Sequence, residues 1–160
     1  MNTPANPYLQ DLAGREPLGA MRDTIADMDF RLRDWPDDRF ERSYGPGKWT
    51  GRQVLTHLAQ TEMALGIRAR MAVATPGYAA QAWDQDSWIA LDARLTGLEA
   101  LDAFVAVALM NLKFFEGLSA DQRARSLTHP EYGTLTVDWV IHQMAGHQIH
   151  HLEHLRKLEG

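Results

Sequence analysis

The chain has 160 residues, of which 45% are hydrophobic and 23% charged, proportions typical of a globular protein that buries its own core. Its formal net charge is −5, and no local run of Lys and Arg offsets it, so we expect no nucleic-acid partner. The chain contains no cysteine, which excludes disulfides, thiolate metal ligands and a cysteine nucleophile.

The beginning of the chain lacks the basic patch and following apolar run that are typical of a signal peptide. No window approaches the roughly 18 apolar residues that a membrane span needs, so we expect no membrane association and a cytoplasmic location. We expect a single domain over residues 1–160. Within it, Pro4, Pro7 and Gly14 predict an irregular N-terminal segment over residues 1–16.

The first long helix is predicted to begin at Pro17, because proline is favoured in a first helical turn. Its apolar residues recur at spacings of three or four: Leu18, Met21, Ile25, Met28 and Leu32. The helix is expected to end near Trp35-Pro36. A connector follows over residues 37–49, in which Gly45-Pro46-Gly47 predicts a turn.

The second long helix has the clearest start in the chain. Thr50 and Gln53 match a capping box, in which the two side chains bind the unpaired backbone amides of a first turn. An apolar stripe continues the pattern to about Val73, and Pro76-Gly77 ends it.

The remaining chain predicts two further long helices. A short helix from Asp86 precedes the third long helix over residues 97–116, and His129-Pro130 to Gly133 predicts a turn before the fourth, over residues 135–158. Four long helical patterns, with no convincing alternating strand, predict an all-α four-helix bundle.

Five of the seven histidines lie in HQMAGHQIHHLEH, residues 142–154. The apolar stripe of this last helix is formed by Val137, Val140, Met144, Leu155 and Leu158. Steps of three or four across its gap place His147 and His151 where core residues should be. Burying neutral imidazoles without partners costs about 1–3 kcal/mol for each unsatisfied group. Hydrogen bonding or a shared metal ion would offset that cost, and the sequence leaves both open.

A metal site inside a bundle needs a ligand from a facing helix, and His57 lies at the edge of the second helix's buried stripe. His150 and His154 are expected to flank the site, with His154 the nearer, and His129 is expected to be exposed in its turn. Three histidines leave coordination positions open, as in catalytic zinc sites, and also suit nickel, iron or copper.

Two segments resemble the DinB/YfiT-like superfamily: PGKWTGRQVLTHLAQTE, and AGHQIHHLEHLRKL near the C-terminus. GYAAQAWDQDSW is similar to the segment that follows the second helix in many members. The likeness covers most of the chain, from about Pro17 to Leu158. It implies an up-down-down-up four-helix bundle that forms a homodimer.

The resemblance also implies a divalent metal held by His57, His147 and His151, the same three residues that the stripe selects. Zinc and nickel are the expected metals, with iron, copper and manganese as alternatives. Characterised relatives include S-transferases and isomerases that use low-molecular-weight thiols such as mycothiol or bacillithiol. His154 departs from the Gln that is frequent in relatives, and Glu62 either orients a ligand or lies at a helix seam.

Two classes of function follow. The first is a metal-dependent thiol S-transferase or hydrolase that acts on a small-molecule substrate; any thiol must come from a cosubstrate, since the chain has no cysteine. The second is a non-catalytic, metal-stabilised bundle that binds a small ligand or a protein partner in a stress response. The second long helix has apolar residues beyond those its buried stripe needs, such as Met63, Ile67 and Met71, and these are available for contacts between subunits.

Overall fold

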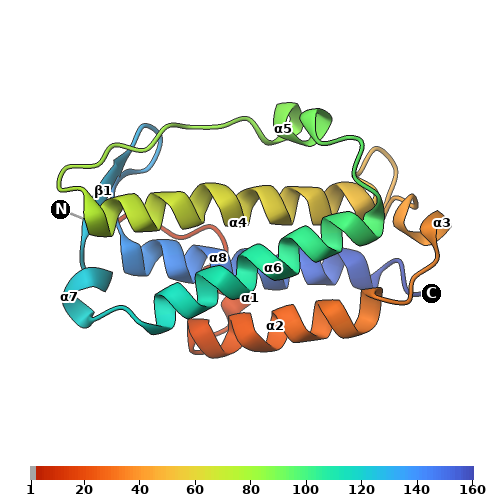
Figure 1. The fold of residues 1–160 in the computed structure, drawn as a ribbon, viewed down its shortest axis with the longest axis horizontal. Helices are drawn as coiled ribbons and strands as arrows, with labels where there is room; N and C mark the ends of the chain where they lie inside the picture. The colour runs from red at the N-terminus through yellow and green to blue at the C-terminus, as the bar shows by residue number, and fades with distance from the viewer. Residues whose placement is uncertain (1–2) are drawn as a thin grey trace.

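The computed structural model describes residues 3–160 and contains four long helices. These are α2 (Pro17–Leu32), α4 (Gly51–Ala74), α6 (Gly97–Glu116) and α8 (Val137–Arg156). In Figure 1, α2 and α8 run in one direction, and α4 and α6 run in the other. Because α4 and α6 are parallel neighbours, the chain between them returns along the whole length of the bundle. The predicted up-down-down-up four-helix bundle is confirmed.

Four one- or two-turn helices and one hairpin complete the described chain. The helices are α1 (Leu9–Leu12), α3 (Asp37–Phe40), α5 (Gln85–Leu91) and α7 (Ala120–Arg123). The N-terminal segment predicted as irregular thus contains a single short helix, and its first two residues lie outside the described part of the chain.

The hairpin is an element that the sequence did not predict. Strands β1 (Ser126–His129) and β2 (Gly133–Thr136) pair antiparallel, with Leu127 opposite Leu135. Each four-residue strand contains a single apolar side chain, Leu127 or Leu135, so the sequence shows no alternation of apolar and polar residues. The same strand delays the start of α8 to Val137.

Local caps fix where the long helices begin. The Thr50 hydroxyl accepts a hydrogen bond from the Gln53 amide at 3.2 Å, and Gln53 Oε1 accepts one from the Thr50 amide at 2.8 Å. This is the predicted capping box, and Thr96 and Glu99 repeat it at the start of α6. The box sets the register of α4 about two turns before His57.

The N-terminal segment packs against α8. Trp139 Nε1 donates to the Pro4 carbonyl at 2.9 Å, and the backbone of Tyr8 rests directly on Gly146. A Cβ atom at Gly146 would lie 2.2 Å from the Tyr8 carbonyl oxygen, so only glycine permits this approach. The segment thereby places the Tyr8 ring over the histidines of α8.

Within residues 3–160, no helix combines the length and the apolar character that crossing a membrane requires.

Candidate metal centre

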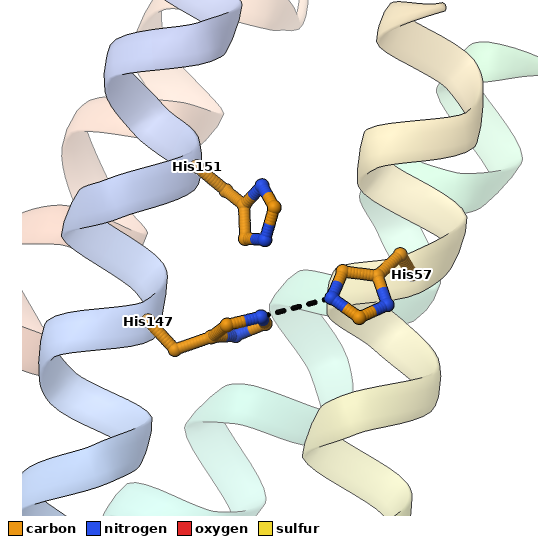
Figure 2. A group of neighbouring side chains, drawn as sticks. All are labelled: His57, His147 and His151. Atoms are coloured by element: carbon orange, nitrogen blue, oxygen red, sulfur yellow. Dashed lines mark hydrogen bonds between the residues drawn. The ribbon is translucent and has the colours of Figure 1, made fainter. Parts of the chain in front are cut away.

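The structure brings three imidazoles together between two helices. Figure 2 shows His57 on α4 facing His147 and His151 on α8 across a shared space. One nitrogen from each ring lies within 4.8 Å of the others, and His57 Nε2 is 2.9 Å from His147 Nε2. Residues 90 positions apart in sequence therefore meet at one point.

Burial keeps the three rings neutral. It lowers the pKa of His57 to about 4, and it lowers the pKa values of His147 and His151 well below the ordinary range, helped by the neighbouring histidines. Neutral imidazole carries the lone pair that a metal ligand needs. A tetrahedral Zn²⁺ ion, about 2.0–2.1 Å from each nitrogen, needs ligand nitrogens roughly 3.3 Å apart, and the observed separations are compatible with this.

His150 and His154, the two histidines expected to flank the cluster, both lie beside His151. His154 Nδ1 lies 3.2 Å from His151 Nδ1, and its ring stacks on Tyr44 with centroids 4.3 Å apart. His150 is half-buried beside Asp11, at 3.3 Å from its carboxylate. His154 thus places a nitrogen within hydrogen-bond distance of a central ring, although the His150 and His154 rings are equally near His151, at 5.1 and 5.2 Å between centroids.

His129 is buried, with 6% of its surface exposed, and the prediction that it is exposed was wrong. Its position at the end of β1, in the hairpin that sequence reasoning missed, explains the error. His129 Nδ1 accepts hydrogen bonds from the backbone amides of Glu131 and Tyr132 at 3.1 and 3.3 Å.

Two tryptophans flank His57. The Trp49 ring lies 4.9 Å from the imidazole and the Trp83 ring 6.0 Å from it, between centroids. Both come from the connectors at the two ends of α4. Both indole rings therefore pack around His57.

Glu62 lies at a seam between three helices. Its carboxyl oxygens accept hydrogen bonds from Gln148 Nε2 at 2.6 Å and from Asn111 Nδ2 at 2.8 Å. Burial raises the pKa of Glu62 to about 7, against the opposing effect of the two bonds. The carboxyl group of Glu62 bonds to these two amides and not to the imidazoles. Of the two roles expected for Glu62, the structure therefore favours a residue at a helix seam over one that orients a metal ligand.

Two hollows reach the histidine cluster from different sides. One, of about 300 Å³, is lined by His57 and His147; the other, of about 660 Å³, is lined by His57 and His151. Tyr8 lines both, and its ring lies 5.0 Å from that of His147. Burial raises the Tyr8 pKa, so the phenol keeps its proton at neutral pH.

Sequence reasoning missed three residues at these hollows: Tyr8, Thr61 and Arg68. Tyr8 belongs to a segment without periodicity, and no sequence signal marks it. The sequence does mark Thr61 and Arg68, because steps of three or four residues from Val54 along the buried stripe of α4 pass through both positions. A polar and a charged residue on a buried stripe are as notable as the histidines of α8.

The structure is a four-helix bundle with a histidine cluster that could hold a metal ion. Comparison with known proteins identifies its family. The sequence profile of the DinB superfamily matches residues 20–155. A protein of Oceanobacillus iheyensis named "Putative metal-dependent hydrolase" is 30% identical over 126 residues, which are 78% of this chain and 73% of that protein. A Bacillus cereus protein of the same description is 27% identical over 134 residues, covering 79% and 74%. The chain belongs to the DinB superfamily.

Solved structures agree on the fold. YfiT from Bacillus subtilis, described as a probable metal-dependent hydrolase with an unusual four-helix bundle topology, superposes with a TM-score of 0.80 at 21% identity, over 89% of this chain and 83% of YfiT. The mycothiol-dependent maleylpyruvate isomerase gives 0.67 at 19% identity, over 95% of this chain and 62% of the isomerase. Identities this low establish shared architecture alone.

Proposed function

We propose that this DinB-superfamily protein is a metal-dependent enzyme in which His57, His147 and His151 hold a divalent cation. Zinc or nickel fits the three imidazoles best, with iron, copper and manganese as alternatives. The observation that supports this is the meeting of three buried, neutral histidines at one point between α4 and α8. The named metal-dependent relatives point the same way.

The donor set fits a catalytic cation. The Nε2 atoms of His57 and His147 face each other at 2.9 Å between buried rings, and an ion shared by these nitrogens would offset the cost of burying the neutral imidazoles. The cluster contains no carboxylate. Three neutral ligands leave the charge of the ion uncompensated and further coordination positions open, which favours an anionic reactant.

The surrounding side chains have defined roles. A bound cation would lower the pKa of a coordinated thiol or water and so supply a nucleophile near neutral pH. Trp83 and Trp49 would each form an apolar wall of one hollow beside His57. With the proton of His151 on Nδ1, His154 Nδ1 would accept a hydrogen bond from it, at 3.2 Å, and hold the orientation of that ring. Tyr8 offers a phenolic proton to both hollows.

Transfer of a thiol explains the two hollows better than hydrolysis does. Hydrolysis needs one organic reactant and water, whereas an S-transferase needs two organic reactants that meet at one ion. The larger hollow is cationic, with Lys48 and Lys157 beside His150 and His154, against the single acid Asp86. It suits a low-molecular-weight thiol that carries negative charge, and such a cosubstrate fits a cytoplasmic location, where thiols stay reduced.

Elemental analysis and X-ray absorption test this proposal. We expect about one divalent ion per chain, lost in His57→Ala and retained in His142→Ala, whose ring bonds only locally to the Asp138 carbonyl. Adding N-acetylcysteine should place sulfur about 2.3 Å from the metal. Bound metal without sulfur would favour the hydrolase, and a His57→Ala chain that cannot fold would favour a non-catalytic, metal-stabilised bundle.

We also propose that the protein forms a homodimer through α4. Met63, Ile67 and Met71 recur at spacings of four on one face of the helix and are 42%, 58% and 37% exposed. Sedimentation velocity should show a dimer that Ile67→Glu dissociates. A wild-type monomer at micromolar concentration would refute the proposal.

A further inference from the structure

We propose that Arg68 forms a subsite for the carboxylate group of a small substrate, in the hollow of about 300 Å³ that His57 and His147 also line. The subsite deepens the proposed function and rests on it for its catalytic meaning. Its binding chemistry, however, comes from residues outside the histidine cluster.

Arg68 is a buried cation without a paired anion. Only 9% of its surface is exposed, and its hydrogen bond is to a neutral group, from Nη2 to the Gln81 carbonyl at 2.5 Å. Across the described chain, no carboxylate oxygen lies within 4.0 Å of its guanidinium, whereas Arg31, Arg33 and Arg123 all pair with acids. Burying an unpaired charge is costly, so an anionic ligand would stabilise this arginine.

The acids that line the hollow do not replace such a ligand. Asp84 and Glu131 are both exposed, and within the described chain neither lies within ion-pairing distance of Arg68. Burial lowers the Arg68 pKa, and Glu131 and Tyr78 only partly oppose this. Arginine nevertheless remains charged at neutral pH, because its ordinary pKa is so high.

Thr61 supplies a second, independent sign of a ligand. It is 6% exposed, it lines the hollow, and its buried hydroxyl has no hydrogen-bond partner within residues 3–160. The other buried helical threonines behave differently: Thr24 and Thr56 donate to the carbonyls of Ala20 and Arg52, at 2.7 and 2.9 Å. The free Thr61 hydroxyl is available to a molecule in the hollow.

His129 adds a third donor. Its Nδ1 accepts two backbone amides, and burial together with nearby Arg68 lowers its pKa. The ring is therefore neutral with its proton on Nε2, which makes that nitrogen a donor. Arg68, Thr61 and His129 all line the hollow, and a set of donors selects an anion.

The geometry favours a small carboxylate that spans from Arg68 to the histidines. His57, Thr61 and Arg68 lie on one face of α4, and eleven residues of helix rise about 16 Å. The His57 and Arg68 side chains both lean toward the N-terminus of the helix, and the longer Arg68 covers part of this separation, while the hollow that both residues line covers the rest. The planar guanidinium matches a planar carboxylate through two parallel hydrogen bonds. The opposite end of such a molecule would then lie beside His57 and His147.

Calorimetric titration of the chelator-treated protein with succinate tests the subsite without any metal. We expect saturable binding by the wild type and at least tenfold weaker binding by Arg68→Met. The control is Arg70→Met, whose arginine bonds to Asn111 and the Gly66 carbonyl instead, and it should bind within twofold of wild type. Succinamide, which has the same shape without charge, should not bind.

Every outcome separates the alternatives. Equal succinate affinity in Arg68→Met and wild type, or equal binding of succinamide, would overturn the subsite; tighter binding of inorganic phosphate would overturn its assignment to carboxylates. Arg68→Met should also unfold at a higher temperature, because it removes an unpaired buried charge. If that variant fails to fold, Arg68→Lys decides, with weakened binding expected. Since metal is absent throughout, failure of the metal proposal leaves this result unchanged.

Discussion

The side-chain amide of Gln148 donates a 2.6 Å hydrogen bond to the Glu62 carboxyl, and the residue before it in the chain is the candidate ligand His147. Asn111 of α6 binds the other carboxyl oxygen at 2.8 Å. The absence of a side chain at Gly66 makes room for Asn111, since a Cβ atom there would lie 2.4 Å from Asn111 Oδ1. One buried carboxyl thus joins three helices directly behind the site.

Glu62 should make the metal-free protein less stable as pH rises. Its pKa is raised from 4.5 to about 7 by burial, so between these values the folded state holds a proton that the unfolded state has lost. The contribution of Glu62 to stability therefore falls through this window, by about 3 kcal/mol in all, and levels off above it. The buried histidines, whose pKa values are lowered, act in the opposite direction below pH 6.5. The effect of Glu62 is therefore the stability of wild type minus that of Glu62→Gln, which should fall from pH 4.5 to 8 in urea unfolding.

Glu99→Gln is the matched control for this measurement. Glu99 is exposed and accepts the backbone amide of Thr96, which lowers its pKa, so its effect lies below the same window. Its stability difference from wild type should stay constant between pH 5 and 8. A Glu62→Gln difference that is equally constant would contradict the raised pKa of Glu62.

Metal should stabilise the fold by mass action. An ion that binds only the folded chain, at a thousand times its dissociation constant, adds about 4 kcal/mol. For a chain of this size that is roughly 8–16 °C in the unfolding temperature. Calorimetry with zinc and then with a chelator should show this shift in the wild type and little of it in His57→Ala. A wild-type unfolding temperature that changes with neither zinc nor the chelator would argue against the metal centre.

His154 should act on the metal through His151. The 3.2 Å contact between their Nδ1 atoms provides an acceptor for the outer proton of a metal-bound His151, and losing such partners typically weakens metal binding 10- to 100-fold. We expect this loss in zinc titrations of His154→Ala. His154→Gln retains an acceptor and should stay within a few-fold of wild type. Identical affinities in all three proteins would show that His154 merely packs on Tyr44.

The long helices and the three histidines could be predicted because periodicity and caps encode them locally. The Thr50–Gln53 box fixes the start of α4, and the stripe of α8 passes through His147 and His151. The up-down-down-up topology was predicted from the family resemblance alone. The connector between α4 and α6 is long enough for α6 to run either parallel or antiparallel to α4. The structure shows that parallel α4 and α6 require this connector to span the bundle.

The hollows could not be predicted, because they depend on contacts between distant segments. Tyr8 reaches the site only because Gly146 lets its backbone approach α8. His129 is buried only because a four-residue strand, too short to recognise, carries it inward. Arg68 and Thr61 lie at stripe positions of α4, so their burial could have been predicted. Their significance depends on what the described chain lacks, which is a paired acid for Arg68 and a hydrogen-bond partner for the Thr61 hydroxyl.

Gly146→Ala should detach the N-terminal segment from α8. Its new Cβ atom would lie 2.2 Å from the Tyr8 carbonyl oxygen and 2.8 Å from the Tyr8 Cβ, so the segment must move. Overpacking of this kind costs about 1–3 kcal/mol, which outweighs the helical preference for alanine of about 1 kcal/mol at most. We expect a lower free energy of unfolding by urea and faster proteolysis before Leu12. In Gly117→Ala the nearest atom would lie at 3.5 Å, so that variant should match or exceed wild type; equal stability of the two variants would show that Gly146 does not hold Tyr8 in place.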